Sequence, residues 1–141
     1  MKFIPYYFIL LLISTSCTSN PSLNIKSWEV IETQTLNEKI QHAYNRNLEW
    51  ATKPELYIFN LFELSNLKKI SYDYNADNIE NPSNVEIKIT RDGFLDDSVR
   101  GDIQYIKLRK SKDGIWKIKQ IKKAISCWRN ESFIYSSEAC P

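Results

Sequence analysis

Residues 103–127, IQYIKLRKSKDGIWKIKQIKKAISC, decide the fold. Apolar and charged side chains alternate on both sides of Asp113-Gly114, as expected for strands with one buried face and one solvated face. An Asp-Gly pair between two alternating runs is a strong signal for a β-hairpin. We therefore predict strands over 103–110 and 115–127, joined by a tight turn.

The second of these runs contains an irregularity. Its inward-facing residues change from Trp116 and Ile118 to Ile121 and Ile125, which is a change from even to odd positions. One inserted residue accounts for such a change. We therefore expect a β-bulge near Lys119-Gln120.

Two further strands are predicted before the hairpin. Residues 69–74 are rich in aromatic and β-branched side chains, and residues 85–90 alternate Val or Ile with polar side chains. Residues 28–31 are expected to form a short strand or an extended entry. A polar loop at 77–83 and a second Asp-Gly pair at 92–93 separate the strands.

The segment before these strands has a helical pattern. Thr35-Leu36-Asn37-Glu38 has the S/T-x-x-E form of a capping box, and apolar side chains then recur with helical spacing. Pro54 fits the first turn of a second helix. We expect helices over 36–50 and 54–65. Two N-terminal helices followed by about four antiparallel strands predict an α+β fold, in which the helices pack on a curved sheet.

The first residues have the pattern of an export signal. Lys2 precedes an apolar run that ends at Ile13, and small residues lead to Cys17. The run is shorter than the roughly 20 residues that a membrane-crossing helix needs. We expect a signal peptide over 1–16, a tether over 17–27 and a single domain over 28–141.

The residues before Cys17 resemble the lipobox of bacterial lipoproteins, which implies that Cys17 is lipidated. Cleavage by ordinary signal peptidase, without lipid, is the alternative. The chain has three cysteines, and lipidation would leave Cys127 and Cys140 to form a disulfide in an oxidising periplasm. The expected location is the periplasmic side of the bacterial cell envelope, as an outer-membrane lipoprotein, because Thr18 resembles a sorting residue.

Charge is distributed unevenly along the chain. Residues 17–100 hold 9 basic and 13 acidic side chains, whereas residues 101–141 hold 9 and 4. The basic residues of the strands and their turn are Lys107, Arg109, Lys110, Lys112, Lys117, Lys119, Lys122 and Lys123. Their alternation with apolar residues favours a solvated sheet face, and an anionic partner is the alternative. Nucleic acid is not an expected partner of an exported protein.

A polar segment at 92–102 is a candidate binding loop. Asp96, Asp97, Arg100 and Asp102 place three carboxylates and one guanidinium close together, where they could bind a small polar ligand. The alternative is local, because Asp side chains bond loop backbone and one of them can pair with Arg100. The spacing does not match a calcium loop, and we expect no metal.

Several of these residues together resemble a family of small, uncharacterised exported bacterial proteins. The matching residues are Asp96-Asp97-Ser98-Val99-Arg100-Gly101, Gly114-Ile115-Trp116, Cys127 and Cys140. The resemblance spans roughly 53–141 and implies an exported, disulfide-bearing domain. It implies no catalytic residue, because the family has no assigned activity. The layout is also similar to cystatin-like and nuclear-transport-factor-2-like folds.

Aromatic residues lie between the two paired cysteines. Trp128, Phe133 and Tyr135 either cover the open end of the sheet or form an exposed recognition patch. His42, the only histidine, lies off the apolar stripe of the first helix, so we expect it to face solvent. Phosphate-binding and hydrolase motifs are absent, and we expect neither a cofactor nor a catalytic residue.

These observations favour a lipid-anchored periplasmic binding or interaction module over an enzyme. It would bind a protein or a small polar ligand through residues 92–102 and 128–135. One alternative is an inhibitor or immunity-type lipoprotein that blocks an exported enzyme. The other is a small hydrolase or isomerase of the curled-sheet type, which would need a pocket with converging polar groups between the first helix and the sheet.

Overall fold

The structure, a computed structural model, describes residues 23–129 and 133–141. The elements in chain order are β1 (Asn24–Ile25), β2 (Glu29–Ile31), α1 (Gln34–Asn45), η1 (Glu49–Thr52), η2 (Pro54–Leu56), α2 (Tyr57–Leu61), β3 (Lys69–Ala76), β4 (Asn84–Asp92), β5 (Val99–Lys110), β6 (Trp116–Cys127) and β7 (Ile134–Tyr135). The expected signal peptide, Cys17 and the first part of the expected tether lie outside the described residues. Within them, no helix has the length and apolar character of a membrane span.

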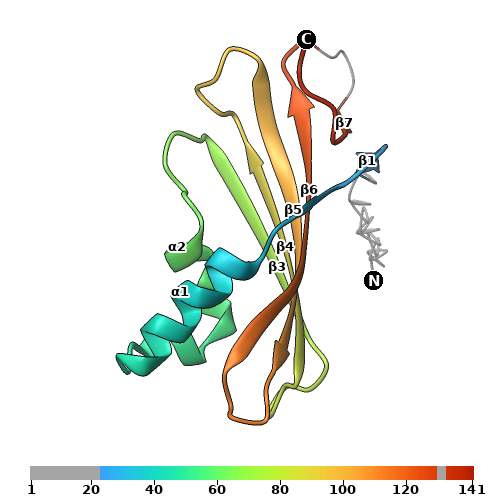
Figure 1. The fold of residues 1–141 in the computed structure, drawn as a ribbon. Helices are drawn as coiled ribbons and strands as arrows, with labels where there is room; N and C mark the ends of the chain where they lie inside the picture. Colours follow the sequence, from blue (N-terminus) through green and yellow to red (C-terminus); the bar gives the residue numbers. More distant parts are fainter. Residues whose placement is uncertain (1–22, 130–132) are drawn as a thin grey trace, which may run out of the picture.

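An antiparallel sheet of five strands, in the order β2-β6-β5-β4-β3, forms the centre of the molecule. The helices lie on one of its faces (Figure 1), so the predicted α+β class is confirmed. The sheet has five strands instead of about four because residues 29–31 pair with β6 and form the edge strand β2. A separate parallel pair joins β1 to β7.

The predicted hairpin is confirmed as β5 and β6. Gly114 in its turn has a φ of 82°, and the Ser111 N–H donates to the Ile115 carbonyl at 2.8 Å. The pairing shifts by one residue between Lys107 and Leu108, where Lys119 is the extra residue of β6. The predicted β-bulge is therefore confirmed.

The predicted helix boundaries were wrong. Helix α1 ends before Asn47, which has a left-handed φ of 55° and so cannot continue the helix. Its N-cap is Thr33, with no side-chain cap hydrogen bond, so the capping box at Thr35 does not form. The second predicted helix is a 3-10 turn, η2, followed by the short α2, which stops where Phe62 becomes extended.

Two apolar clusters lie on opposite faces of the sheet. The larger one joins the helices to the face that we call the helix face; its members include Ile40, Ile58, Ile87, Ile106 and Ile121. The smaller one contains Ile103, Ala124 and Tyr135, with Ile25 and Trp28 packed against it.

Strand alternation places the smaller cluster on the opposite face, which we call the outer face. Ile103 and Ala124 are register partners, and each differs in parity from its neighbour in the larger cluster, Ile106 or Ile121. Strands β1 and β7 therefore cover the outer face (Figure 1). Strand β1 thus lies within the segment expected to be a tether.

Candidate interaction surface at one end of the sheet

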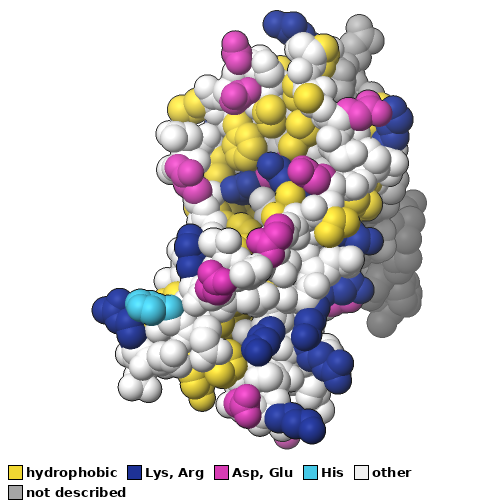
Figure 2. Space-filling model, in the orientation of Figure 1, with side chains coloured by type: hydrophobic (Ala, Val, Ile, Leu, Met, Phe, Trp, Pro, Cys, Tyr) yellow, Lys and Arg dark blue, Asp and Glu magenta, His cyan; other side chains and the backbone are white. Residues whose placement is uncertain are grey.

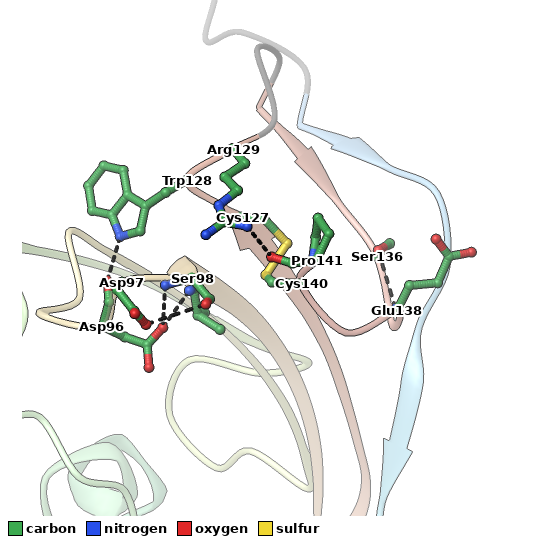
Figure 3. Close-up of a disulfide and its surroundings, with 11 residues drawn as sticks. Asp96, Asp97, Ser98, Cys127, Trp128, Arg129, Ser136, Glu138, Cys140 and Pro141 are labelled. Atoms are coloured by element: carbon green, nitrogen blue, oxygen red, sulfur yellow. Dashed lines mark hydrogen bonds between the residues drawn. A yellow bond between two sulfur atoms is a disulfide. The ribbon is translucent and has the colours of Figure 1, made fainter.

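Most of the candidate residues meet at the end of the sheet opposite the β5–β6 turn. The β4–β5 loop and the residues that follow β6 lie side by side there (Figure 3). The indole Nε1 of Trp128 donates to the Asp96 carbonyl at 2.8 Å, and the Trp128 N–H donates to the Ser98 carbonyl at 2.9 Å. The first of these bonds joins residues that are 32 positions apart in the chain.

The carboxylate of Asp96 accepts hydrogen bonds from the backbone of its own loop. Its Oδ1 accepts the N–H groups of Val99 at 2.6 Å and of Ser98 at 2.8 Å. These bonds hold the pKa of the Asp96 carboxyl below its usual range, with Val99 making the larger contribution. Asp97 is exposed and accepts the Ser98 hydroxyl at 3.3 Å. The alternative in which Asp side chains bond the backbone of their own loop therefore holds for Asp96, whereas Asp97 faces solvent.

Arg100 connects the loop to the aromatic residues. It is the bulged residue between Val99 and Gly101, and its Nε donates to Asp92 Oδ1 at 3.1 Å. Its guanidinium carbon lies 3.7 Å from the centroid of the Phe133 ring and 5.2 Å from that of the Trp128 ring. Stacking of guanidinium on aromatic rings is favourable, so Arg100 holds both rings in place.

Three large apolar side chains are left exposed around this arrangement. Leu95, Trp128 and Phe133 are 75%, 40% and 56% exposed. Together with the carboxylate of Asp97 we call them the end patch. Figure 2 shows hydrophobic side chains gathered over this end of the molecule, with acidic side chains at the margin. Exposed apolar groups that cluster in this way are typical of interaction sites.

The predicted cysteine pair is confirmed. Cys127 and Cys140 are joined by a disulfide, with their Cα atoms 5.6 Å apart. It returns the C-terminal tail to the end of β6, where Ser136 also pairs with Ile125. Tyr135 is buried in the outer-face cluster. The structure therefore assigns Tyr135 to the interior, whereas Trp128 is left at the surface.

Asp102 lies in β5 and not in the loop where the sequence placed it. It is fully buried, and its Oδ1 accepts from Arg91 Nε at 2.8 Å. Its Oδ2 accepts from Gln104 Nε2 at 3.1 Å. Arg91 also donates to the carbonyl of Glu63 at 2.7 Å, so this ion pair ties the sheet to the segment after α2. Because it is buried from solvent, Asp102 is not available to bind a partner directly.

Sequence reasoning missed Arg91, which is the partner of Asp102. The two residues lie opposite each other in the β4–β5 register, and this relation is visible only when the pairing of the strands is known. One signal was available in the sequence: residue 91 continues the odd-numbered series of Val85, Ile87 and Ile89, whose side chains face the helices. A charged side chain on that face needs a partner.

An open hollow of about 550 Å³ lies beside this ion pair. Its lining comprises Glu63, Ser65, Asn66, Arg91, Phe94, Leu95 and Asp96. The charge of Arg91 is already matched by Asp102, and Asp96 is bonded to its loop. The space between α1 and the sheet, where the enzyme alternative would need a pocket, is occupied largely by the larger apolar cluster.

One other sequence prediction concerns helix α1, away from this end of the sheet. His42 is exposed on α1, as expected. No group of three His, Cys, Asp or Glu side chains within 23–129 and 133–141 is placed to hold a metal ion.

Comparison with known proteins gives no relative: no family model, curated protein or solved structure matches this chain. The resemblance to exported bacterial proteins therefore remains a prediction.

Proposed function

We propose that this protein is an exported, lipid-anchored interaction module whose end patch binds a protein partner in the cell envelope. One observation carries the proposal: Leu95, Trp128 and Phe133 are exposed together, on a support held by a hydrogen bond, a guanidinium contact and a disulfide. An anchor that is fixed before binding loses little conformational entropy when the complex forms.

Each aromatic anchor is held by a separate contact. The ring of Trp128 is fixed by the hydrogen bond from its Nε1 to the Asp96 carbonyl. In the chain, Trp128 directly follows Cys127, which is held by the disulfide. The ring of Phe133 lies against the guanidinium of Arg100. Aromatic side chains near the centre of a contact area supply much of the free energy of protein–protein binding. This supports an interface more than an enclosed ligand site.

The charges beside the patch indicate the chemistry of the partner. Arg100 is matched by Asp92, whereas Asp97 has no cation within salt-bridge distance among the described residues. The exposed surface is therefore apolar with an acidic side. The complementary partner surface is an apolar pocket bordered by Lys or Arg.

The expected anchor would enter close to the patch. Residue Asn24 of β1 is the register partner of Ile134, and Ile134 follows Phe133 directly. The chain from Cys17 to Leu23 spans at most about 20 Å when extended. A lipid on Cys17 would hold the end patch near the bilayer, so the expected partner is itself associated with the membrane.

Anchoring is tested by metabolic labelling with a fatty acid in a bacterial host. We expect label in the full-length protein and none in the Cys17→Ala variant. The Cys140→Ser variant is the matched control and retains the label. Equal labelling of the Cys17→Ala variant and the natural chain contradicts lipidation of Cys17.

The interface is tested by partner recovery from solubilised membranes. The double variant Trp128→Ala, Phe133→Ala is expected to lose a partner that co-purifies with the natural chain. Phe59→Ala removes a side chain on α2 that is 64% exposed, and it should retain the same partner. The interface is refuted if both variants recover the partner equally, or if only variants with lower unfolding free energy lose it.

An inhibitor of an exported enzyme is the second candidate. The observation in its favour is the braced β4–β5 loop, in which two backbone N–H groups bind the carboxylate of Asp96. A loop that keeps its shape can occupy an active site without being ordered by it. The activity of the recovered partner separates the two functions: an inhibited enzyme supports the second one.

A further inference from the structure

The outer face of the sheet carries unevenly matched charge. Lys107 and Arg109 alternate with the buried Ile106 and Leu108, so their side chains lie on the outer face. Lys122 is the register partner of Tyr105 and lies on the same face. On the neighbouring strands, β3 and β4, the charges are paired: Lys88 with Asp73 at 3.4 Å, and Lys107 with Glu86 at 3.0 Å.

The cations at the end of β5, in the hairpin turn and along β6 are different. We call Arg109, Lys112, Lys117, Lys119 and Lys122 the basic strip. Within the described residues, none of these side chains has a carboxylate at salt-bridge distance. Figure 2 shows Lys and Arg gathered toward the hairpin end of the molecule. The strip is therefore an uncompensated positive field on one part of the surface.

This arrangement opposes folding. Arg109 and Lys117 are direct cross-strand partners, and like charges in that position are destabilising. The cations also line a hollow of about 210 Å³ at the turn. Lysines on an edge strand discourage aggregation, and β6 is such an edge at Lys117 and Lys119, because β2 pairs only with residues 121–123. Edge protection does not account for Arg109 or Lys122, which lie where strands pair on both sides, so an anionic partner explains the placement of the whole strip better.

The shape of the strip and the course of the chain indicate which anion binds. The strip extends from the hairpin turn to Lys122, toward β1, which covers the same outer face. A soluble anion would need only the hollow at the turn. A planar surface of anionic headgroups would contact the whole strip.

We propose that the basic strip binds the headgroups of anionic phospholipids, so that the outer face of the sheet lies on a bilayer. The proposal deepens the proposed function, because it rests on a lipid at Cys17 bringing this face to the membrane. A single acyl chain binds a membrane only weakly and reversibly, and a basic surface supplies the second contact that stable attachment needs. The end patch, at the edge of the bound domain, remains open to a partner.

The test is vesicle sedimentation with the full chain carrying Cys17→Ala, which removes the acylation site. Vesicles of phosphatidylcholine, with and without phosphatidylglycerol, are compared at low and high salt. Any binding by the apolar residues 3–13 is common to both vesicles, so the difference between them reports the strip. We expect tighter binding to the anionic vesicles, and this preference should weaken with salt.

Variants locate the binding surface. Neutralising Arg109, Lys117 and Lys119 to Gln should weaken the anionic preference roughly a hundredfold, at roughly fivefold for each cation near the surface. The matched control neutralises Lys39, Arg46 and Lys68, which are exposed outside the strip, and should change the preference little. Replacing the three strip residues by Arg or Lys, with charge kept, should retain it.

Three outcomes overturn the proposal. The first is equal binding to the two kinds of vesicle. The second is an equal loss in the strip variant and in its control. The third is binding of soluble polyphosphate by the strip without binding to anionic vesicles, which would make a soluble anion the occupant. Fatty-acid labelling tests lipidation at Cys17 separately. The vesicle assay uses the Cys17→Ala variant, so a lack of lipidation does not change the preference for anionic vesicles.

Discussion

Asp96, Asp97 and Asp102 belong to one short segment, yet each carboxylate has a different environment. Asp96 binds the backbone of its own loop, Asp97 is exposed, and Asp102 is buried against Arg91. Only the second is free to contact a partner directly. All three side chains can accept hydrogen bonds or pair with a cation, and the pairing of the strands decides which of these interactions each one makes.

The buried ion pair makes a prediction at the residue scale. Asp102→Ala leaves Arg91, whose side chain is 13% exposed, without its counter-charge. We expect the free energy of unfolding to fall by about 3–5 kcal/mol, measured by urea denaturation. Asp97→Ala is the matched control and should change it by no more than about 0.5 kcal/mol. Equal urea midpoints for the two variants would refute the structural role of Asp102.

Tyrosine ionisation gives a second prediction. The hydrogen bond to Glu86, followed by burial, raises the pKa of Tyr105 to about 12. The folded state thus favours the neutral phenol, and this stabilisation is fully present below about pH 10, the ordinary tyrosine pKa. It is lost as the pH rises through about 12. Absorbance titration of tyrosinate should show one such late group fewer in Tyr105→Phe. Ionisation of all tyrosines near pH 10 in the folded protein would contradict this prediction.

The start of β5 is the element on which the end patch rests, and Gly101 is its critical residue. A Cβ there would lie 2.2 Å from the backbone carbonyl oxygen of Arg91, which cannot move without breaking the sheet. We expect Gly101→Ala to cost about 3 kcal/mol or more in unfolding free energy. Gly114→Ala is the control: it meets no atom within 4 Å but keeps a φ of 82°, so about 1–2 kcal/mol is expected. Equal losses of unfolding free energy in the two variants would show that the close approach of the Arg91 carbonyl does not require glycine at position 101.

The C-terminal tail provides the other element-scale prediction. Replacing Cys127 and Cys140 by Ser opens a loop with a sequence separation of 13. We expect the free energy of unfolding to fall by about 3 kcal/mol, measured by urea denaturation. Faster amide exchange at Trp128 and Ser136 should accompany the loss, because both lie in the tail closed by the disulfide. Unchanged exchange at both positions would show that the disulfide does not brace the end patch.

Local signals determined which elements could be predicted from the sequence. The hairpin and its bulge followed from Asp113-Gly114 and from the parity change after Ile118, because both signals act over a few residues. The helix ends did not, since α1 stops at a left-handed Asn47 that no nearby glycine or proline indicated. The three-residue β2 depends on an open edge of β6. That edge exists only after the sheet has formed.

The candidate site was predictable to a similar extent. Asp96, Asp97, Arg100 and Trp128 do meet at one end of the sheet, and the sequence placed them in two segments that flank strands. Asp102 was misplaced, and the two alternatives for Tyr135 could not be decided, because their partners, Arg91 and the outer-face cluster, come from distant parts of the chain. Leu95 and Phe133 became part of the end patch only through their exposure.

At the scale of the whole molecule, two exposed surfaces lie at different places on the sheet. The end patch lies at one end, and the basic strip extends along the outer face toward the other end. The helices cover the helix face and close it with the larger apolar cluster (Figure 1). In the arrangement that we propose, one domain would contact a bilayer and a protein at once, without competition between the two contacts.

Site-specific photo-crosslinking in intact cells tests the proposed interface most directly. A photoreactive residue is placed at Leu95 in the end patch, and at Ile79, which is 98% exposed in the β3–β4 loop, as the control. We predict a discrete crosslinked adduct in the membrane fraction from position 95 and none of that size from position 79. The same adducts from both positions, or none from position 95, would contradict the proposal that the end patch binds a partner.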